Sequence, residues 1–350
     1  MNSKVVAAVD LGYGHAKYSR VRGPEVVFDS FPSFATTGGA ASSMANGAGL
    51  RELDVVSVSV DGRDYLVGKD AHLIRGASVE RNRDANYSAS DQYMAMMLGC
   101  MWYMQQSVID VLVVGLPMNT LEKSKEALKA RLKGTHVVPE WRTECRDVKI
   151  DKTSVEVKEV LAYGQPVGAL LDVCAAHPEF QRDNLVVIDV GYNTLDLFGM
   201  EDGKPRPDRI AAWPGGVASY IDEVMRSLNA QVRREHPEMR EDLRISSHAY
   251  EAAIRTGRPL RTSLGDLDLA PHIRTAAPRL EGQLDLLAAK LDAYGDITRA
   301  VIAGGGAPLL HEPFKKRFPL LKQVFVPENP QFSVVRGFWQ AGRAKAGIGG

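Results

Sequence analysis

The feature that most constrains this chain is a strand–turn–strand pattern that occurs twice. Residues 5–19 read VVAAVDLGYGHAKYS, and residues 185–198 read LVVIDVGYNTLDLF. In both stretches an apolar strand ends at an aspartate, a glycine-containing turn follows, and a second strand leads away. The equivalent pairs, 179 positions apart, are Asp10 and Asp189, Gly12 and Gly191, and Tyr13 and Tyr192. A duplicated domain whose two turns face each other across one ligand explains such a repeat.

Strand and helix patterns alternate through both halves, which indicates an α/β fold, and 350 residues suffice for about two domains. In the first half we expect a loop over 35–49, hairpins around Asp61-Gly62 and within 148–161, a buried strand at 110–117, and helices at 90–106, 121–132 and 165–177. In the second half we expect a strand pair over 185–212, a glycine turn that opens a helix near 215, mostly helical residues over 227–262, an amphipathic helix at 280–294, a strand, glycine turn and helix over 297–310, a strand at 324–328 and a final helix from 332.

The composition excludes several classes of protein. Lys plus Arg and Asp plus Glu number 43 each, and no basic block stands out, so direct binding to nucleic acid is disfavoured. Three cysteines without paired spacing fit a reducing cytoplasm, and no zinc-type cluster of histidines and cysteines occurs in the sequence. The apolar stretch 93–104 is shorter than the about 20 residues that span a bilayer. We therefore expect a cytoplasmic protein that has no membrane partner.

The two turns have the chemistry of a phosphate site. Glycine allows the backbone to approach a phosphate closely, and an aspartate at the end of a buried strand can hold Mg²⁺, usually through its waters. Asp10 and Asp189 are thus candidates for positioning Mg²⁺ and an attacking water, and Lys17 can neutralise phosphate charge. A single Asp-x-Gly is a common turn, whereas two copies in matching context favour a site.

Other nucleotide motifs fit less well. The turn after Gly14 leads to a strand rather than to the helix of a dinucleotide fingerprint, and the P-loop pattern is absent from the sequence. Residues 303–308, AGGGAP, form a glycine turn between a strand and a helix. Such a turn suits the close approach of a nucleotide's phosphates or adenosine.

Together these motifs resemble the five-part signature of the actin, Hsp70 and sugar-kinase superfamily. Asp10 to Lys17 resembles the first phosphate motif, and Asp189 to Thr194 resembles the second. Gln165-Pro166-Val167-Gly168-Ala169 resembles the first connecting helix. Gly215-Gly216 resembles the glycine turn of the second domain, and Ala303 to Ala307 resembles the adenosine motif. GYGxxK, IAGGGAPLL and NPQFSVVRGFW most resemble the plasmid-segregation actins of the ParM/StbA branch.

The resemblance implies the actin-like ATPase fold, an α/β fold in which two related ribonuclease-H-like domains, each with a smaller inserted subdomain, surround a nucleotide cleft. Domain I would cover 1–180 with an insertion at about 30–85, and domain II would cover 181–350 with an insertion at about 217–295. The C-terminal helix, at about 332–345, would pack back toward domain I.

The resemblance also implies residue roles toward ATP, or GTP, and Mg²⁺. Asp10 and Asp189 would lie near the metal, and Gln165 would orient the water, although a polar residue is also ordinary at a helix N-terminus. The nucleotide would contact Gly12, Tyr13, Gly14, Lys17, Gly191, Tyr192, Asn193, Thr194, Gly215, Gly216, Gly304, Gly305 and Gly306. Tyr13 and Tyr192 replace small residues of many relatives, which leaves the exact phosphate contacts open.

The function implied is a slow ATPase that polymerises with itself and moves plasmid or phage DNA through a DNA-bound adaptor. A monomeric sugar or metabolite kinase is the main alternative, and Gln165 at the water position argues against it. A non-motile, non-hydrolysing scaffold is a third possibility.

Overall fold

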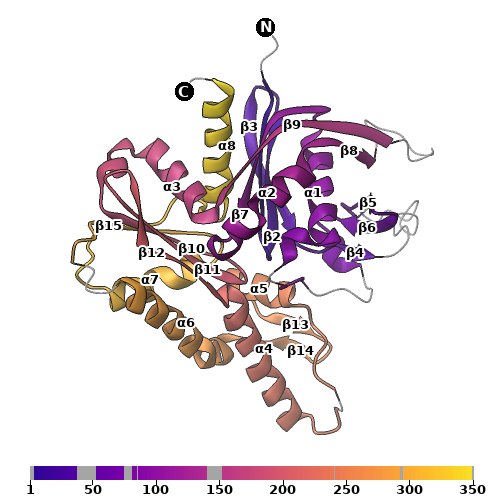
Figure 1. The fold of residues 1–350 in the computed structure, drawn as a ribbon. Coiled ribbons are helices and arrows are strands. Elements are labelled where there is room, and N and C mark those ends of the chain that lie inside the picture. Colours follow the sequence, from indigo (N-terminus) through magenta and orange to yellow (C-terminus); the bar gives the residue numbers. More distant parts are fainter. Residues whose placement is uncertain are drawn as a thin grey trace.

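The computed structural model describes residues 4–37, 53–74, 81–84, 86–139, 152–239, 241–291 and 295–348. In these residues two mixed sheets lie beside each other, with helices between and around them (Figure 1). We call the part built on the first sheet the first lobe and the part built on the second sheet the second lobe. The loop expected over 35–49 falls almost wholly outside the described residues.

The first sheet contains both strands of the first signature. Within the described residues its order is β3-β2-β1-β7-β9-β8. β1 pairs antiparallel with β2 and parallel with β7, which in turn pairs parallel with β9. The strands are β1 (Val6–Leu11), β2 (His15–Arg22), β3 (Glu25–Pro32), β7 (Val108–Leu116), β8 (Gly134–Pro139) and β9 (Lys152–Gly164).

The second sheet repeats this arrangement around the second signature. Its order in the described residues is β12-β11-β10-β15-β16, and β10 pairs antiparallel with β11 and parallel with β15. The strands are β10 (Leu185–Val190), β11 (Thr194–Glu201), β12 (Lys204–Pro214), β15 (Arg299–Ala303) and β16 (Val324–Phe325). The sequence repeat is therefore a repeat of the tertiary structure.

Helices α3 (Gln165–Ala176) and α8 (Ser333–Ala346) fill the space between the two sheets. Successive strand residues point to opposite faces, so Val187 of β10 packs on these helices while Ile188 packs on the other side of its sheet. Phe338 of α8 is fully buried in this central layer. Two sheets packed on the same pair of helices form one continuous body.

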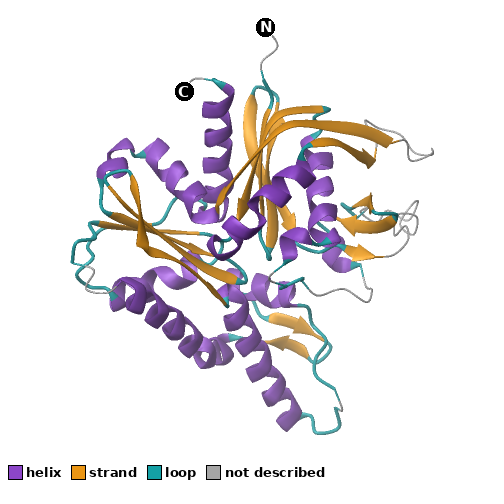
Figure 2. Cartoon of the chain, viewed as in Figure 1, coloured by secondary structure: helices purple, strands orange, loops and turns teal. Residues whose placement is uncertain are grey.

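Helices α1, α2, α6 and α7 cover the outer faces of the two large sheets (Figure 2). Methionines of α1 and two leucines of α2 pack on the first sheet, and α6 and α7 pack on the second. Helices α4 and α5 pack together with α6 in a separate cluster around the buried Tyr250. The bounds are α1 (Asp91–Met104), α2 (Met118–Leu132), α4 (Gly216–Glu235), α5 (Ser247–Thr256), α6 (Ala270–Leu291) and α7 (Ala307–Arg317).

Two small sheets complete the described structure. One consists of β4 (Thr36–Thr37), β5 (Val56–Val60) and β6 (Arg63–Val67), and the other of β13 (Leu260–Thr262) and β14 (Gly265–Leu267). The hairpin expected around Asp61-Gly62 joins β5 to β6, and both turn residues have positive φ.

Most of the expected elements are confirmed, but one hairpin prediction is wrong. A hairpin was expected within 148–161, but residues 152–164 form one strand, β9, whose antiparallel partner is β8. Residues 148–151 of that stretch lie outside the described residues, and the alternating burial of Val155 and Val157 continues through one strand. Helix α6 also begins at Ala270 rather than near 280, with Pro278 inside it, and residues 227–262 are only partly helical.

The division near residue 180, with insertions at 30–85 and 217–295, stays a prediction, as does the docking of the C-terminal helix as a domain feature. In the structure, α8 packs on α3 and on β1 and β7 of the first sheet. In the described part of the chain, each helix is too short or too polar to cross a membrane.

Candidate functional site

The two signature turns are built alike. In the first, the Gly12 amide donates to the His15 carbonyl at 3.2 Å, and in the second the Gly191 amide donates to the Thr194 carbonyl at 2.9 Å. Each turn joins two antiparallel strands, so the aspartate one residue before the end of the first strand faces a residue of the second. Asp10 is paired with Lys17 and Asp189 with Asp196. The equivalent of the first lobe's lysine is thus a carboxylate in the second lobe.

Asp10 lies at the centre of a buried polar group in the first lobe. Its side chain is 1% exposed and accepts from Lys17 Nζ at 2.7 Å and from Gln165 Nε2 at 2.7 Å. Burial acts to lower the pKa of Lys17, but the attraction of Asp10, Asp189 and Glu251, together with the hydrogen bond to Asp10, outweighs it and the pKa is raised. Lys17 therefore stays a cation beside Asp10. Gln165 reaches this position because β9 ends at Gly164, where helix α3 begins.

Asp189 lies where three glycine turns of the second lobe converge. The second signature turn accepts the amides of Gly215, Val217 and Ala218 at 2.8, 3.0 and 2.6 Å, so the start of α4 is tied to it. Gly304 has φ +85°, and a Cβ there would lie 2.3 Å from Asp189 Oδ1. Only glycine fits this cradle beside the carboxylate. The Gly306 amide donates to Val190 at 2.9 Å, and Gly305 is open on its side-chain face.

The two turns meet at Gly14 and Tyr192. A Cβ on Gly14 would lie 2.8 Å from the Tyr192 Cβ, so the backbone of one turn abuts the side chain of the other. The Tyr13 ring turns toward Tyr87, with centroids 5.2 Å apart, and its hydroxyl donates to the Asp84 carbonyl at 3.1 Å. The tyrosines that replace small residues are therefore packed beside the turns. Asn193 and Thr194 complete the second turn, where Asn193 Nδ2 donates to the Arg83 carbonyl at 3.4 Å.

The carboxylates of the two lobes are close enough to affect each other. Burial, followed by the repulsion of Asp10, raises the pKa of Asp189 to about 7, while Lys17 acts in the opposite direction. Asp189 is buried, with 6% of its surface exposed, yet no described residue donates a hydrogen bond to its carboxylate. A buried carboxylate in this condition is suited to a cation or a proton.

Sequence reasoning missed Asp196. Burial raises the pKa of Asp196 to about 6, and its Oδ1 accepts from the Met118 amide of the first lobe at 2.8 Å. Its Oδ2 is buried without a hydrogen-bond partner in the described structure. Placing the two signatures in register would have found it, because Asp196 stands where Lys17 stands in the first copy.

The residues fit a nucleotide that carries Mg²⁺. Oxygen atoms of Asp10 and Asp189 are hard ligands of the kind that Mg²⁺ takes, and the orphaned Asp196 oxygen adds negative potential. The described residues contain no group of three or more His, Cys, Asp or Glu placed to enclose an ion. Two carboxylates with a phosphate chain between them match the way Mg²⁺ is usually held, through water and substrate oxygens.

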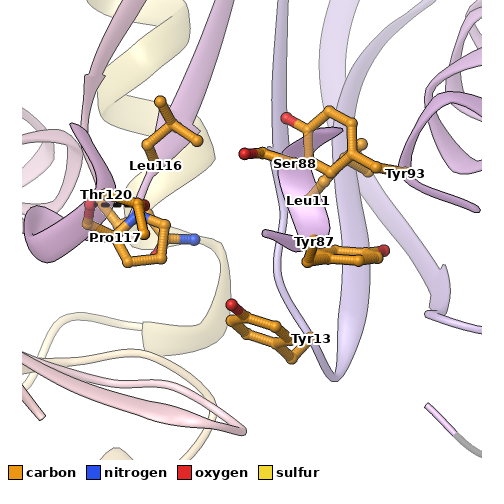
Figure 3. Close-up of a pocket in the computed structure, with 10 residues that line it drawn as sticks. Leu11, Tyr13, Tyr87, Ser88, Tyr93, Leu116, Pro117 and Thr120 are labelled. Carbon is orange, nitrogen blue, oxygen red and sulfur yellow. Dashed lines mark hydrogen bonds between the residues drawn. The ribbon is translucent and has the colours of Figure 1, made fainter. Parts of the chain in front are cut away.

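A small pocket lies beside Gln165 in the first lobe. Figure 3 shows Tyr13, Ser88 and Tyr87 on one side and Leu116, Pro117 and Thr120 on the other, with the hydroxyls of Tyr13 and Ser88 directed into the gap. Gln165 is among the residues that line it. A hydroxyl-rimmed space next to a buried amide can hold an ordered water.

The raised pKa of Asp189 predicts that this residue destabilises the nucleotide-free protein. A group whose folded pKa lies above its unfolded value contributes stability below pH 3.8, and that contribution is lost as the pH rises to about 7. Asp189→Asn should therefore raise the free energy of unfolding at pH 8 by on the order of 2–4 kcal/mol, with little gain at pH 4. Urea unfolding at both pH values measures this. Asp64→Asn, at an exposed position of β6, is the control. An Asp189→Asn variant that is less stable than the wild type at pH 8 would contradict this expectation.

The chain is similar to a known protein family and to several solved structures. Residues 8–168 match the family described as the N-terminal domain of actin-like proteins. A solved archaeal actin homologue, also known in complex with ADP, is similar over 97% of this chain and 99% of that chain in both forms. The identities are 20% and 18%, and the TM-scores 0.73 and 0.74. A ParM of a 15-stranded filament from Clostridium botulinum is similar over 98% and 99%, with 18% identity and a TM-score of 0.75.

No curated protein sequence matches the chain. The actin-like protein Alp7A adds a solved structure with 16% identity over 97% of this chain and 96% of that chain, and a TM-score of 0.66. The fold expected from the sequence is therefore confirmed. Residues 8–168 thus match the N-terminal domain of actin-like proteins, and the whole described chain shares the fold of the solved actin homologues.

Proposed function

We propose that this chain binds ATP with Mg²⁺ between its two lobes, hydrolyses it slowly, and assembles into filaments. The observation that carries the proposal is the pair of buried acidic hairpins that meet at Gly14 and Tyr192, with Gln165 bonded to Asp10. Phosphoryl transfer depends mostly on positioning and on charge stabilisation, and this arrangement supplies both.

Each residue has a role in this proposal. Mg²⁺, when bound, neutralises charge that develops on the phosphates. Lys17 supplies a further buried positive charge, and the glycine turns supply backbone amides close to the phosphate chain. Gln165, next to its hydroxyl-rimmed pocket, orients the attacking water. Asp189, with a pKa near 7, is suited to accept the proton that the water loses.

The proposed nucleotide site extends to the second lobe's glycine turns. Gly215, Gly216 and the run Gly304 to Gly306 lie around the carboxyl end of β10, where a nucleoside attached to the phosphates would rest. ATP, rather than GTP, is our proposal for that nucleoside. Because ATP would contact both lobes, it would favour the arrangement in which they are closed.

The segregation role rests on likeness to other proteins. The similar structures include a ParM filament and an Alp12 filament, which supports self-assembly of this chain. With 43 basic and 43 acidic residues the chain is not a natural ligand for DNA. We propose that it acts in the cytoplasm and that an adaptor bound to a centromere-like site on plasmid or phage DNA joins the filament to its load.

Light scattering of the purified chain tests this function. With Mg²⁺ and ATP the signal should rise as filaments form and then decay as phosphate is released, whereas EDTA should prevent the rise. Electron microscopy of the same samples identifies filaments. A non-hydrolysable ATP analogue is the control, for which scattering should rise without decay. Flat scattering with turnover that requires a sugar would favour the kinase, and stable filaments without turnover would favour a scaffold.

A further inference from the structure

Residues 81–84 of the first lobe lie directly against the second lobe. Arg83 forms a two-pronged ion pair with Asp222 of α4, in which Nη1 and Nη2 lie 2.5 and 3.0 Å from the two carboxylate oxygens. Arg81 Nη2 lies 2.7 Å from Oε2 of Glu251 in α5. Two neighbouring arginines thus reach two different helices of the second lobe, 139 and 170 positions away in the sequence.

The same arginines hold Tyr192, at the tip of the second signature turn. The guanidinium carbon of Arg81 lies 4.1 Å from the centre of the tyrosine ring, and that of Arg83 lies 5.5 Å from it. Arg83 Nη2 also donates to the Tyr192 hydroxyl at 3.4 Å. A cation over an aromatic face is attractive, and more so when it is shielded from water.

The first signature turn is tied to the same segment. The Tyr13 hydroxyl donates to the carbonyl of Asp84, and Asn193 of the second turn donates to the carbonyl of Arg83. One stretch of four residues therefore contacts both turns of the candidate nucleotide site. This accounts for the two tyrosines, which the phosphate chemistry of the turns does not require.

Burial makes the Arg81 contact the strong part of this arrangement. Arg81 is 5% exposed, and its Nε and Nη1 have no partner in the described structure. Burial acts to raise the pKa of Glu251, yet Arg81 and His15 lower it overall, so Glu251 is a carboxylate. His15 and His248, which face the pair, have pKa values lowered by burial to about 3 and about 4 and are neutral near pH 7. Arg83 and Asp222, in contrast, are accessible and can be exchanged without disturbing a core.

We propose that Arg81 and Arg83, together with their partners in the second lobe, form a clasp that holds the two lobes closed and controls nucleotide exchange. The partners are Tyr192, Asp222 and Glu251. This inference rests on the proposed nucleotide site. When the lobes separate, the ion pairs and the ring contacts must break together, so the clasp slows both opening and release of the nucleotide. The contacts of the clasp are made by the protein itself and do not need the nucleotide. Because the nucleotide would also contact both lobes, closure by the clasp and nucleotide binding favour each other.

A charge exchange at the accessible pair tests the clasp. Arg83→Asp and Asp222→Arg should each accelerate dissociation of the fluorescent analogue MANT-ATP about tenfold, within the usual range of coupling between sites. The double variant restores the pair in reversed order and should return the rate to within about threefold of the wild type. The exposed pair Arg244 and Glu241, exchanged in the same way, should leave the rate unchanged. A double variant as fast as the single variants would overturn the clasp.

A second measurement needs no nucleotide. Spin labels at Ser59→Cys and Arg258→Cys, one in each lobe, report the distance between the lobes after Cys145 is replaced by serine. In nucleotide-free protein, Arg83→Asp should broaden the distance distribution toward longer values, and adding Asp222→Arg should narrow it again. Unchanged distributions in all variants would refute the clasp. If the labels respond while wild-type protein binds no MANT-ATP, the clasp stands and the nucleotide function fails.

Discussion

Replacing Gln165 by alanine should slow phosphate release from bound ATP by ~10²-fold, the usual contribution of a group that positions a reactant or a proton, and leave ATP-dependent assembly intact. The side chain is 7% exposed, lines the pocket beside the two hairpins and donates to Asp10. Its side chain bonds Asp10 of the first lobe, so we expect closure of the lobes not to depend on it. Single-turnover phosphate release, recorded alongside light scattering, separates the two effects.

The Asp10 hydrogen bond offers a second explanation for such a loss, and Gln165→Glu distinguishes the two. Glutamate keeps an oxygen that can accept from water, but it lacks the Nε2 donor to Asp10. If Gln165 acts on the water, the glutamate variant should retain more activity than the alanine variant. Equal losses would assign Gln165 to holding Asp10. Unchanged release in both variants would remove Gln165 from the mechanism.

Replacing Asp10 should abolish the Mg²⁺-dependent part of nucleotide binding, an effect that we expect to exceed ~10²-fold because a buried carboxylate and its cation interact strongly in a site of low dielectric. Asp10→Ala also leaves the Lys17 cation in a site where that side chain is only 15% exposed. Breaking a buried pair in this way costs about 3–5 kcal/mol of stability, so the alanine variant risks unfolding.

Asp10→Asn avoids that risk, because its amide oxygen can still accept from Lys17 or Gln165 while the negative charge is removed. Titration of MANT-ATP with and without Mg²⁺ should show that the metal no longer tightens binding, with circular dichroism confirming the fold. Lys17→Met is the complementary variant, which should weaken binding of the triphosphate even without the metal. Wild-type affinity of Asp10→Asn in the presence of Mg²⁺ would show that the carboxylate is not at the metal.

Local elements were predictable because their signals are local. The positive-φ turn at Asp61-Gly62, the continuous apolar run of the fully buried strand β10 and the glycine run before α7 each depend on fewer than a dozen neighbouring residues. The hairpin within 148–161 was wrong for the complementary reason. Strand β9 continues through a charged stretch because β7 and β8 pair with it on either side, which the stretch itself does not encode.

The sequence alone determined the repeat: two hairpins of the same register, each with an aspartate at the end of a buried strand and glycines after it, and from these the nucleotide site that we propose. Only the tertiary structure decided which side chains meet across the repeat. Gln165 bonds Asp10 over 155 positions, Arg81 reaches Glu251 over 170, and Met118 bonds Asp196 over 78. Strand periodicity and turn chemistry act over a few residues, whereas these contacts exist because two sheets pack on the same helices, α3 and α8.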